Sequence, residues 1–124
     1  MWFGNYVTMK WWNDLWLNES FADFVCFLCL SFINKDMPFE TVDSWSAFLK
    51  NKAWGYQEDK RTTTHPIAGV VENTSKADSI FDGITYSKGA AVLKQLYFLI
   101  GHENFSNNLK TYFEKYGWSN ATLS

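Results

Sequence analysis

Hydrophobic positions along the chain recur mainly at the three- and four-residue spacing of a helix. Four stretches follow this pattern, and we predict helices over residues 14–34, 39–52, 85–100 and 103–116, the second beginning at either Phe39 or Thr41. Pro38 separates the first two helices, and Gly101 and Gly117 follow the last two, as is usual where helices end. The sequence therefore predicts a mainly α-helical bundle.

Two regions depart from the helical pattern. Residues 2–13 are rich in aromatic side chains and contain Gly4-Asn5, which is typical of a turn. Residues 55–79 are polar and irregular, and we predict a long loop of a kind that often carries function. The length of 124 residues suits one domain at most.

The first predicted helix is apolar on almost every side, which is typical of a buried helix. It nevertheless carries four polar residues near its start, Asp14, Asn18, Glu19 and Asp23. Since a helix turns by about 100° per residue, Glu19 and Asp23 lie about 40° apart on one face, and Asp14 and Asn18 on another. The helix dipole explains Asp14 at the helix start. It does not explain Glu19 further in, because a buried carboxylate is costly unless it is paired or binds a metal.

Composition and charge narrow the range of functions. The net charge is −2 and no run of Lys or Arg stands out, so nucleic-acid binding has no electrostatic basis. The longest strongly apolar run, residues 24–30, is shorter than the ~20 residues of a membrane-spanning helix, so we predict no membrane segment. Cys26 and Cys29 lie in this run, and we predict that they are buried as small hydrophobic side chains. The alternative is a redox pair, which favours polar surroundings.

Residues 2–22, WFGNYVTMKWWNDLWLNESFA, closely resemble the segment that follows the zinc motif in aminopeptidase N-type metallopeptidases. In that family H-E-x-x-H is followed by eighteen residues and then by a glutamate in an N-E-x-F-A context, which is the third zinc ligand. Glu19 occupies the position of this glutamate, and the count places the second histidine just before Met1. Ser20 stands where the family often has glycine.

A second segment, residues 81–93 (FDGITYSKGAAVL), looks like the family's F-x-x-I-x-Y-x-K-G-A block. The resemblance implies that Tyr86 is the catalytic tyrosine. The Thr-His-Pro-Ile sequence at residues 64–67 resembles the loop upstream of that block, and we expect His65 to have a structural role. The likeness to the family covers residues 2–118, which is nearly the whole chain.

The resemblance implies the chemistry of a zinc aminopeptidase that removes N-terminal residues from peptide substrates. In such a site two histidines and one glutamate hold the zinc, which polarises the scissile carbonyl and activates a water molecule. Glu19 would be the metal ligand, and Tyr86 would donate a hydrogen bond to the oxyanion. Asp23 is a candidate partner for a zinc-bound histidine, and Asn18 and Asp14 are candidates for polar contacts that support the site.

The resemblance also implies that residues 1–124 are part of a catalytic domain, truncated at both ends, and correspond to the C-terminal helical lobe of a thermolysin-like domain. The chain contains neither H-E-x-x-H nor the G-x-M-E-N motif that binds the amino terminus of the substrate in the family. Two zinc ligands and the general base are therefore missing from it. We expect the isolated chain to be inactive, because zinc affinity comes from several ligands held together.

One alternative is a non-catalytic helical remnant that acts as a partner-binding module, with the remainder of the enzyme as a candidate partner. Aromatic residues make up 19% of the chain, and this surplus would suit an exposed interface. The family includes soluble cytoplasmic enzymes and membrane-anchored ectoenzymes, and both compartments remain open.

Overall fold

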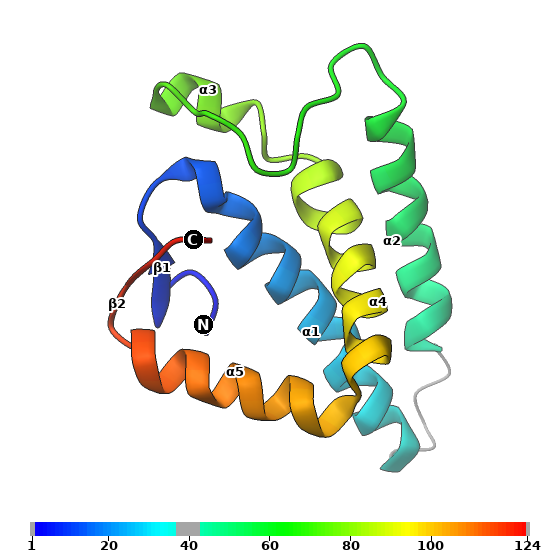
Figure 1. Ribbon diagram of the computed structural model, residues 1–124. Coiled ribbons are helices and arrows are strands. Elements are labelled where there is room, and N and C mark those ends of the chain that lie inside the picture. The colour runs from blue at the N-terminus through cyan, green and yellow to red at the C-terminus, as the bar shows by residue number, and fades with distance from the viewer. Residues whose placement is uncertain (1, 37–42, 124) are drawn as a thin grey trace.

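Helices make up most of the computed structural model, which describes residues 2–36 and 43–123 (Figure 1). The described helices are α1 (Leu15–Asp36), α2 (Ser44–Asp59), α3 (Thr74–Asp78), α4 (Gly89–Ile100) and α5 (His102–Tyr116). Helix α1 packs against α2 and α4, and α5 packs against α4. The prediction of a helical bundle is therefore confirmed, as are the positions of the first and last predicted helices.

The hydrophobic core lies where the four long helices meet. Its buried residues are Phe24, Leu28, Phe48, Ala90, Ala91, Leu93 and Phe105. The ring of Phe24, which is fully buried, meets Phe105 of α5 edge-on with 5.6 Å between the ring centroids. Small residues at positions 90 and 91 allow α4 to lie close to α1, since alanine adds little bulk between two helix backbones.

Helix α2 is longer than predicted. The carboxylate of Asp43 caps its start by accepting hydrogen bonds from the backbone N–H groups of Trp45 and Ser46, at 3.1 and 3.2 Å. Both predicted starts, at residues 39 and 41, lie outside the described residues. The predicted end at Lys52 is wrong, because the helix continues through Gly55 to Asp59.

The third predicted helix has two parts. Residues Ile84–Lys88 form a π-helical turn, η2, and α4 follows directly from it. The loop predicted over residues 55–79 is shorter in the structure, since α2 occupies its beginning and α3 its end. The side chain of Asn73 caps α3 by accepting from the N–H of Lys76 at 2.9 Å.

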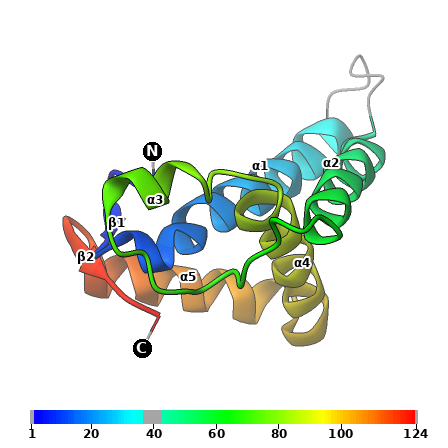
Figure 2. The same cartoon turned by 90° about the horizontal axis from the view of Figure 1, so that it is seen from above.

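A short parallel sheet joins the two ends of the described chain, and the helical pattern did not predict it. Strand β1 (Val7–Met9) pairs with β2 (Ser119–Ala121), with Val7 opposite Ser119. The predicted turn at Gly4-Asn5 leads into β1, and Gly4 has a φ of 109°, which favours glycine. Seen from above, the loop before α3 passes over the start of α1 (Figure 2). Trp11 holds it there by donating from Nε1 to the carbonyl oxygen of Val71 at 2.7 Å.

The second half of α1 is more exposed than its apolar sequence predicts. Cys26 and Cys29 are both exposed, so the prediction that they are buried is wrong. Since Phe24 and Leu28 face the core, Cys26 lies about 200° round the helix from Phe24, on the side away from α2 and α4. The stretch Trp12–Ile33 is long and apolar enough to span a membrane by length and composition, a test that the core helix of a soluble protein also passes.

Candidate functional site

Helix α1 and the π-turn η2 bring together the two residues that the sequence singled out. The phenol of Tyr86, in the middle of η2, lies close enough to the carboxylate of Glu19 on α1 for that carboxylate to raise its pKa. The two elements pack directly against each other, although they are far apart in the chain. Glu19 and Tyr86 therefore form one site.

Burial and negative charge keep the phenol of Tyr86 protonated. Burial is the largest cause that raises its pKa, followed by the interaction with the Glu19 carboxylate and then by the charge of Asp23. Together they raise the pKa of Tyr86 to about 12. At neutral pH the side chain is therefore a hydrogen-bond donor.

Asp23 lies on the same side of α1 as Glu19, as the helical spacing predicted. Burial raises its pKa, the hydrogen bond from Asn51 lowers it, and the nearby charge of Glu19 raises it. Asn51 reaches Asp23 from α2, where it donates from its amide Nδ2 to the carboxylate. The site therefore holds two close carboxylates and a phenol, with one amide that partly compensates Asp23.

Helix α2 contributes a second residue that the sequence did not single out. The ring of Trp54 lies beside the ring of Tyr86, with 6.4 Å between centroids and 31° between the planes. Asn51 and Trp54 are three residues apart, so both face the site from one side of α2. Their spacing was a usable signal, but the predicted helix ended before Trp54.

Close backbone contacts hold the three elements of the site. Ser20, next to Glu19, is fully buried and donates a hydrogen bond to the backbone oxygen of Thr85 at 2.6 Å. A Cβ atom on Gly89 would overlap with Ser20 Oγ. A Cβ atom on Gly55 would lie 2.8 Å from the backbone nitrogen of Lys88. Gly55 therefore lets α2 approach the end of η2, and Gly89 lets the start of α4 approach α1.

Of the other two predicted supporting residues, Asn18 lies in the first turn of α1 and Asp14 ends the 3-10 turn η1 (Trp12–Asp14) just before it. Asn18 is buried, and its amide donates to the sulfur of Met9 at 3.3 Å. Asp14 accepts a hydrogen bond from the backbone N–H of Leu123 at 3.3 Å. Both residues attach the start of α1 to the segments around β1 and β2.

His65, for which we expected a structural role, contacts an aspartate carboxylate. Its Nε2 lies 2.8 Å from Oδ2 of Asp82, just before η2. The other carboxylate oxygen, Oδ1, accepts from the backbone N–H of Ile84 at 2.9 Å and of Thr85 at 3.1 Å. Asp82 therefore caps the turn that carries Tyr86, and the sequence did not predict this.

The described residues do not by themselves form a zinc site. Within residues 2–36 and 43–123 there is no group of three or more His, Cys, Asp or Glu side chains that could hold a metal ion. A catalytic zinc needs about three protein ligands. Among the described residues, Glu19 could serve only as one ligand of a larger set.

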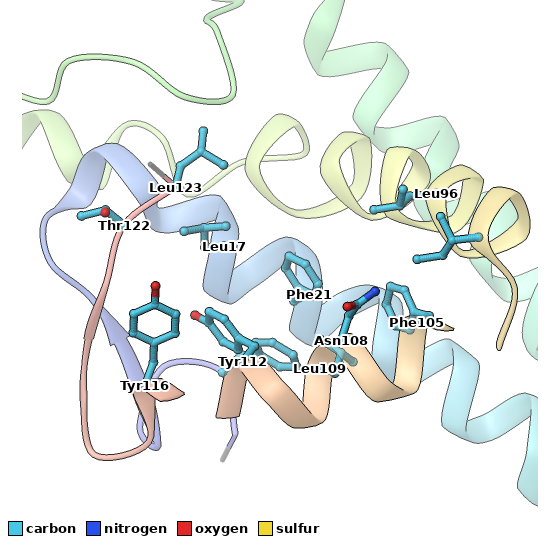
Figure 3. A pocket seen from close by; sticks show the side chains of 12 residues that line it. Leu17, Phe21, Leu96, Phe105, Asn108, Leu109, Tyr112, Tyr116, Thr122 and Leu123 are labelled. Carbon is cyan, nitrogen blue, oxygen red and sulfur yellow. The ribbon is translucent and has the colours of Figure 1, made fainter. Parts of the chain in front are cut away.

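An apolar cavity of about 400 Å³ lies apart from this site, between α1, α4, α5 and the segment after β2 (Figure 3). Its lining includes Leu17, Phe21 and Leu109, together with the side chains of Tyr112 and Tyr116. The described lining contains no carboxylate and no histidine. The chemistry that the sequence predicts therefore belongs to the Glu19–Tyr86 site and not to this cavity.

Comparison with known proteins matches the whole chain to one family. A model described as the peptidase family M1 domain matches residues 1–124. The chain is 43% identical over 126 residues to Aminopeptidase N of Streptomyces lividans, which covers 100% of the chain and 14% of that relative. It is 42% identical over 120 residues to Aminopeptidase M1-A of Oryza sativa subsp. japonica, covering 97% and 13%. It is 40% identical over 121 residues to Leucyl aminopeptidase of Saccharolobus solfataricus, covering 97% and 15%. The chain thus spans about a seventh of the length of these relatives.

Proposed function

Because the chain belongs to the peptidase family M1, we propose that it is a section of the catalytic domain of a zinc aminopeptidase. In this proposal Glu19 is a zinc ligand and Tyr86 is the catalytic hydrogen-bond donor. The observation that carries it is the packing of η2 against α1, which brings the Tyr86 phenol close enough to the Glu19 carboxylate for that charge to raise its pKa. A phenol held beside a metal-ligand carboxylate lies within reach of a substrate carbonyl bound at the metal.

Tyr86 suits the task of stabilising negative charge on the substrate oxygen. Its raised pKa means that the phenol stays protonated well above the neutral range. A preorganised donor in a partly buried site stabilises a developing oxyanion more than water does. Zinc, when bound, would polarise the scissile carbonyl of the peptide.

Asp23 is proposed to accept a hydrogen bond from a zinc-ligand histidine. Its partner within the described residues is the Asn51 amide, which uses one of its two carboxylate oxygens. The remaining oxygen is available to a donor from outside the chain. Carboxylates in this position orient the imidazole and increase its basicity.

The exposed apolar surface supports the proposal that the chain packs against further polypeptide. Large apolar residues with more than half of their surface exposed include Val92, Phe98 and Leu99 on α4. Val92 and Leu99 lie about 20° apart around α4, and monomeric domains rarely leave large apolar patches exposed. We propose that the longer protein covers them, completes the zinc ligand set and binds the peptide substrate, and that α1 is a core helix of that domain. The isolated chain is then inactive.

Two measurements test the proposal. Calorimetric titration of the isolated chain with zinc should give no micromolar binding, since only one ligand of the set is present. In the longer protein that contains this chain, Tyr86→Phe should lower kcat for an aminoacyl anilide by about 10²–10³. Glu19→Gln should lower the bound zinc.

Tyr112→Phe is the matched control, because Tyr112 is a part-buried tyrosine that lines the apolar cavity. It should leave kcat within about twofold of the parent, since it lies outside the proposed site. Full activity of the Tyr86→Phe variant, or tight zinc binding by the isolated chain, would overturn the assignment.

A further inference from the structure

The π-turn that carries Tyr86 is attached at its start to one residue. Asp82 receives three successive backbone N–H groups, those of Ile84 and Thr85 at its carboxylate Oδ1 and that of Tyr86 at its backbone oxygen, at 3.1 Å. π-helical turns are rare and are frequently found at functional sites. The orientation of Tyr86 therefore depends on the position of the Asp82 side chain.

His65 fixes that side chain from the loop between α2 and α3. Its Nε2 contacts Asp82 Oδ2 at 2.8 Å, and both side chains are 21% exposed. The other ring nitrogen, Nδ1, lies 2.8 Å from the backbone oxygen of Pro66, which restricts rotation of the imidazole. With His65 in place, one carboxylate oxygen of Asp82 faces the loop and the other faces the turn.

The neighbouring loop residue acts on the opposite end of the same turn. Thr64 donates from Oγ1 to Asp59 Oδ1 at 3.0 Å, and that oxygen also accepts from Lys88 Nζ at 2.7 Å. The Lys88 and Asp59 side chains are 37% and 35% exposed, more than His65 and Asp82. Exposed ion pairs contribute little, so the His65–Asp82 contact is the stronger of the two.

We propose that His65 is a positioning residue for Tyr86 and acts through the carboxylate of Asp82. Without His65 the carboxylate is free to rotate, the cap of the turn weakens, and the phenol loses its fixed position beside Glu19. The inference rests on the proposed function in one respect, which is that the orientation of Tyr86 affects activity only if Tyr86 is the catalytic hydrogen-bond donor. The loop is thus a support for the site and not merely a connection.

Amide hydrogen exchange in the 124-residue chain, followed residue by residue by NMR, tests the mechanical part. In His65→Ala the amides of Ile84, Thr85 and Tyr86 should exchange about tenfold faster, because a charge-assisted contact that supports their acceptor is lost. His65→Gln, whose amide can donate to Asp82, should restore much of the protection. If the His65→Ala variant does not fold, the exchange rates of His65→Gln are compared with those of the parent chain instead.

Asn73→Ala is the matched control, since it removes a side-chain helix cap from α3 and leaves η2 intact. It should not change exchange of residues 84–86. The inference is wrong if His65→Ala leaves these amides protected, or if Asn73→Ala exposes them equally. It is also wrong if His65→Gln is no better than His65→Ala.

Kinetics in the longer protein test the link to Tyr86. His65→Ala should lower kcat about tenfold with KM unchanged, and His65→Gln should recover it, since a misplaced donor affects the transition state more than substrate binding. If Tyr86→Phe has no effect on kcat, the proposed function fails. The exchange result still decides whether His65 holds the turn.

Discussion

Replacing Gly89 with alanine should separate α1 from the turn that carries Tyr86. A methyl group at this position would overlap with Ser20 Oγ and lie 2.7 Å from both Ser20 Cβ and Ile67 Cδ1. Overpacking of this kind costs about 1–3 kcal/mol. If Ser20 Oγ rotates away, the 2.6 Å hydrogen bond to Thr85 is lost as well, at a further cost of about 1 kcal/mol.

The intrinsic helix preference of alanine works in the opposite direction. It favours alanine over glycine by about 1 kcal/mol inside a helix, so the net loss should be about 1–3 kcal/mol of unfolding free energy. Urea unfolding of the 124-residue chain, followed by far-ultraviolet circular dichroism at 25 °C, measures this loss. Gly69→Ala is the control, because the nearest atom to the new methyl group would be 3.9 Å away. It should be neutral or slightly stabilising.

A second substitution identifies the contact responsible. Ser20→Gly, made in the Gly89→Ala background, removes both Ser20 atoms that the methyl group meets and should recover about 1–3 kcal/mol as a coupling free energy. Ser20→Ala should recover less, since its Cβ remains. Two results would refute the reasoning, namely a Gly89→Ala variant as stable as the parent or a double-mutant cycle without coupling.

Three other predictions follow from the site and from α1. In an ultraviolet pH titration, we expect the parent chain to contain one phenol that ionises near pH 12 and that is missing from the Tyr86→Phe variant. If the missing phenol instead ionises near pH 10, the proposed environment of Tyr86 is wrong. Since the raised pKa means that the folded chain holds this proton more tightly, its contribution to stability should be complete below pH 10 and lost as the pH rises towards 12. The pKa of Asp23 is also raised, so its effect on stability has the same direction. The stabilisation from its protonated form should be complete below pH 3.8 and lost as the pH rises through its pKa in the folded chain. Asp23→Asn should therefore stabilise the fold more at pH 7 than at pH 3, and an equal effect at both would be inconsistent with burial of the charge. Cys26 and Cys29 should both react with a thiol reagent in the folded chain at rates close to those in urea, whereas protection of either would place it inside a core.

Local spacing predicted the features of the fold that depend on neighbouring residues. The periodic pattern gave the first and last long helices and placed Glu19 and Asp23 on one face of α1. The aspartate at position 43 was a usable cap signal for α2, although its start was predicted earlier in the chain. These features follow from helix geometry, which repeats every 3.6 residues and can be read within a window of the sequence.

Long-range contacts account for what the sequence did not predict. Gly55 was predicted to begin a loop but lies inside α2, where its missing side chain allows the close contact with Lys88. The contribution of Asn51 to the site depends on how α2 crosses α1, and helical spacing carries no information on crossing. The exposure of Cys26 differs from the predicted burial for a related reason. An apolar helix face predicts that the face is covered, but it does not tell which part of the polypeptide covers it.

The pairing of Val7–Met9 with Ser119–Ala121 closes almost the entire described chain into a ring. Loop-closure entropy for so long a segment opposes the pairing until the helices have shortened the distance between its ends. The two strands should therefore associate late in folding. Protection of their amides from hydrogen exchange should appear only when folding is nearly complete. A single proteolytic cut in the loop between α2 and α3 would leave both fragments joined through this sheet and the helix contacts. The cleaved chain should then run as one species in native gel electrophoresis and as two fragments under denaturing conditions.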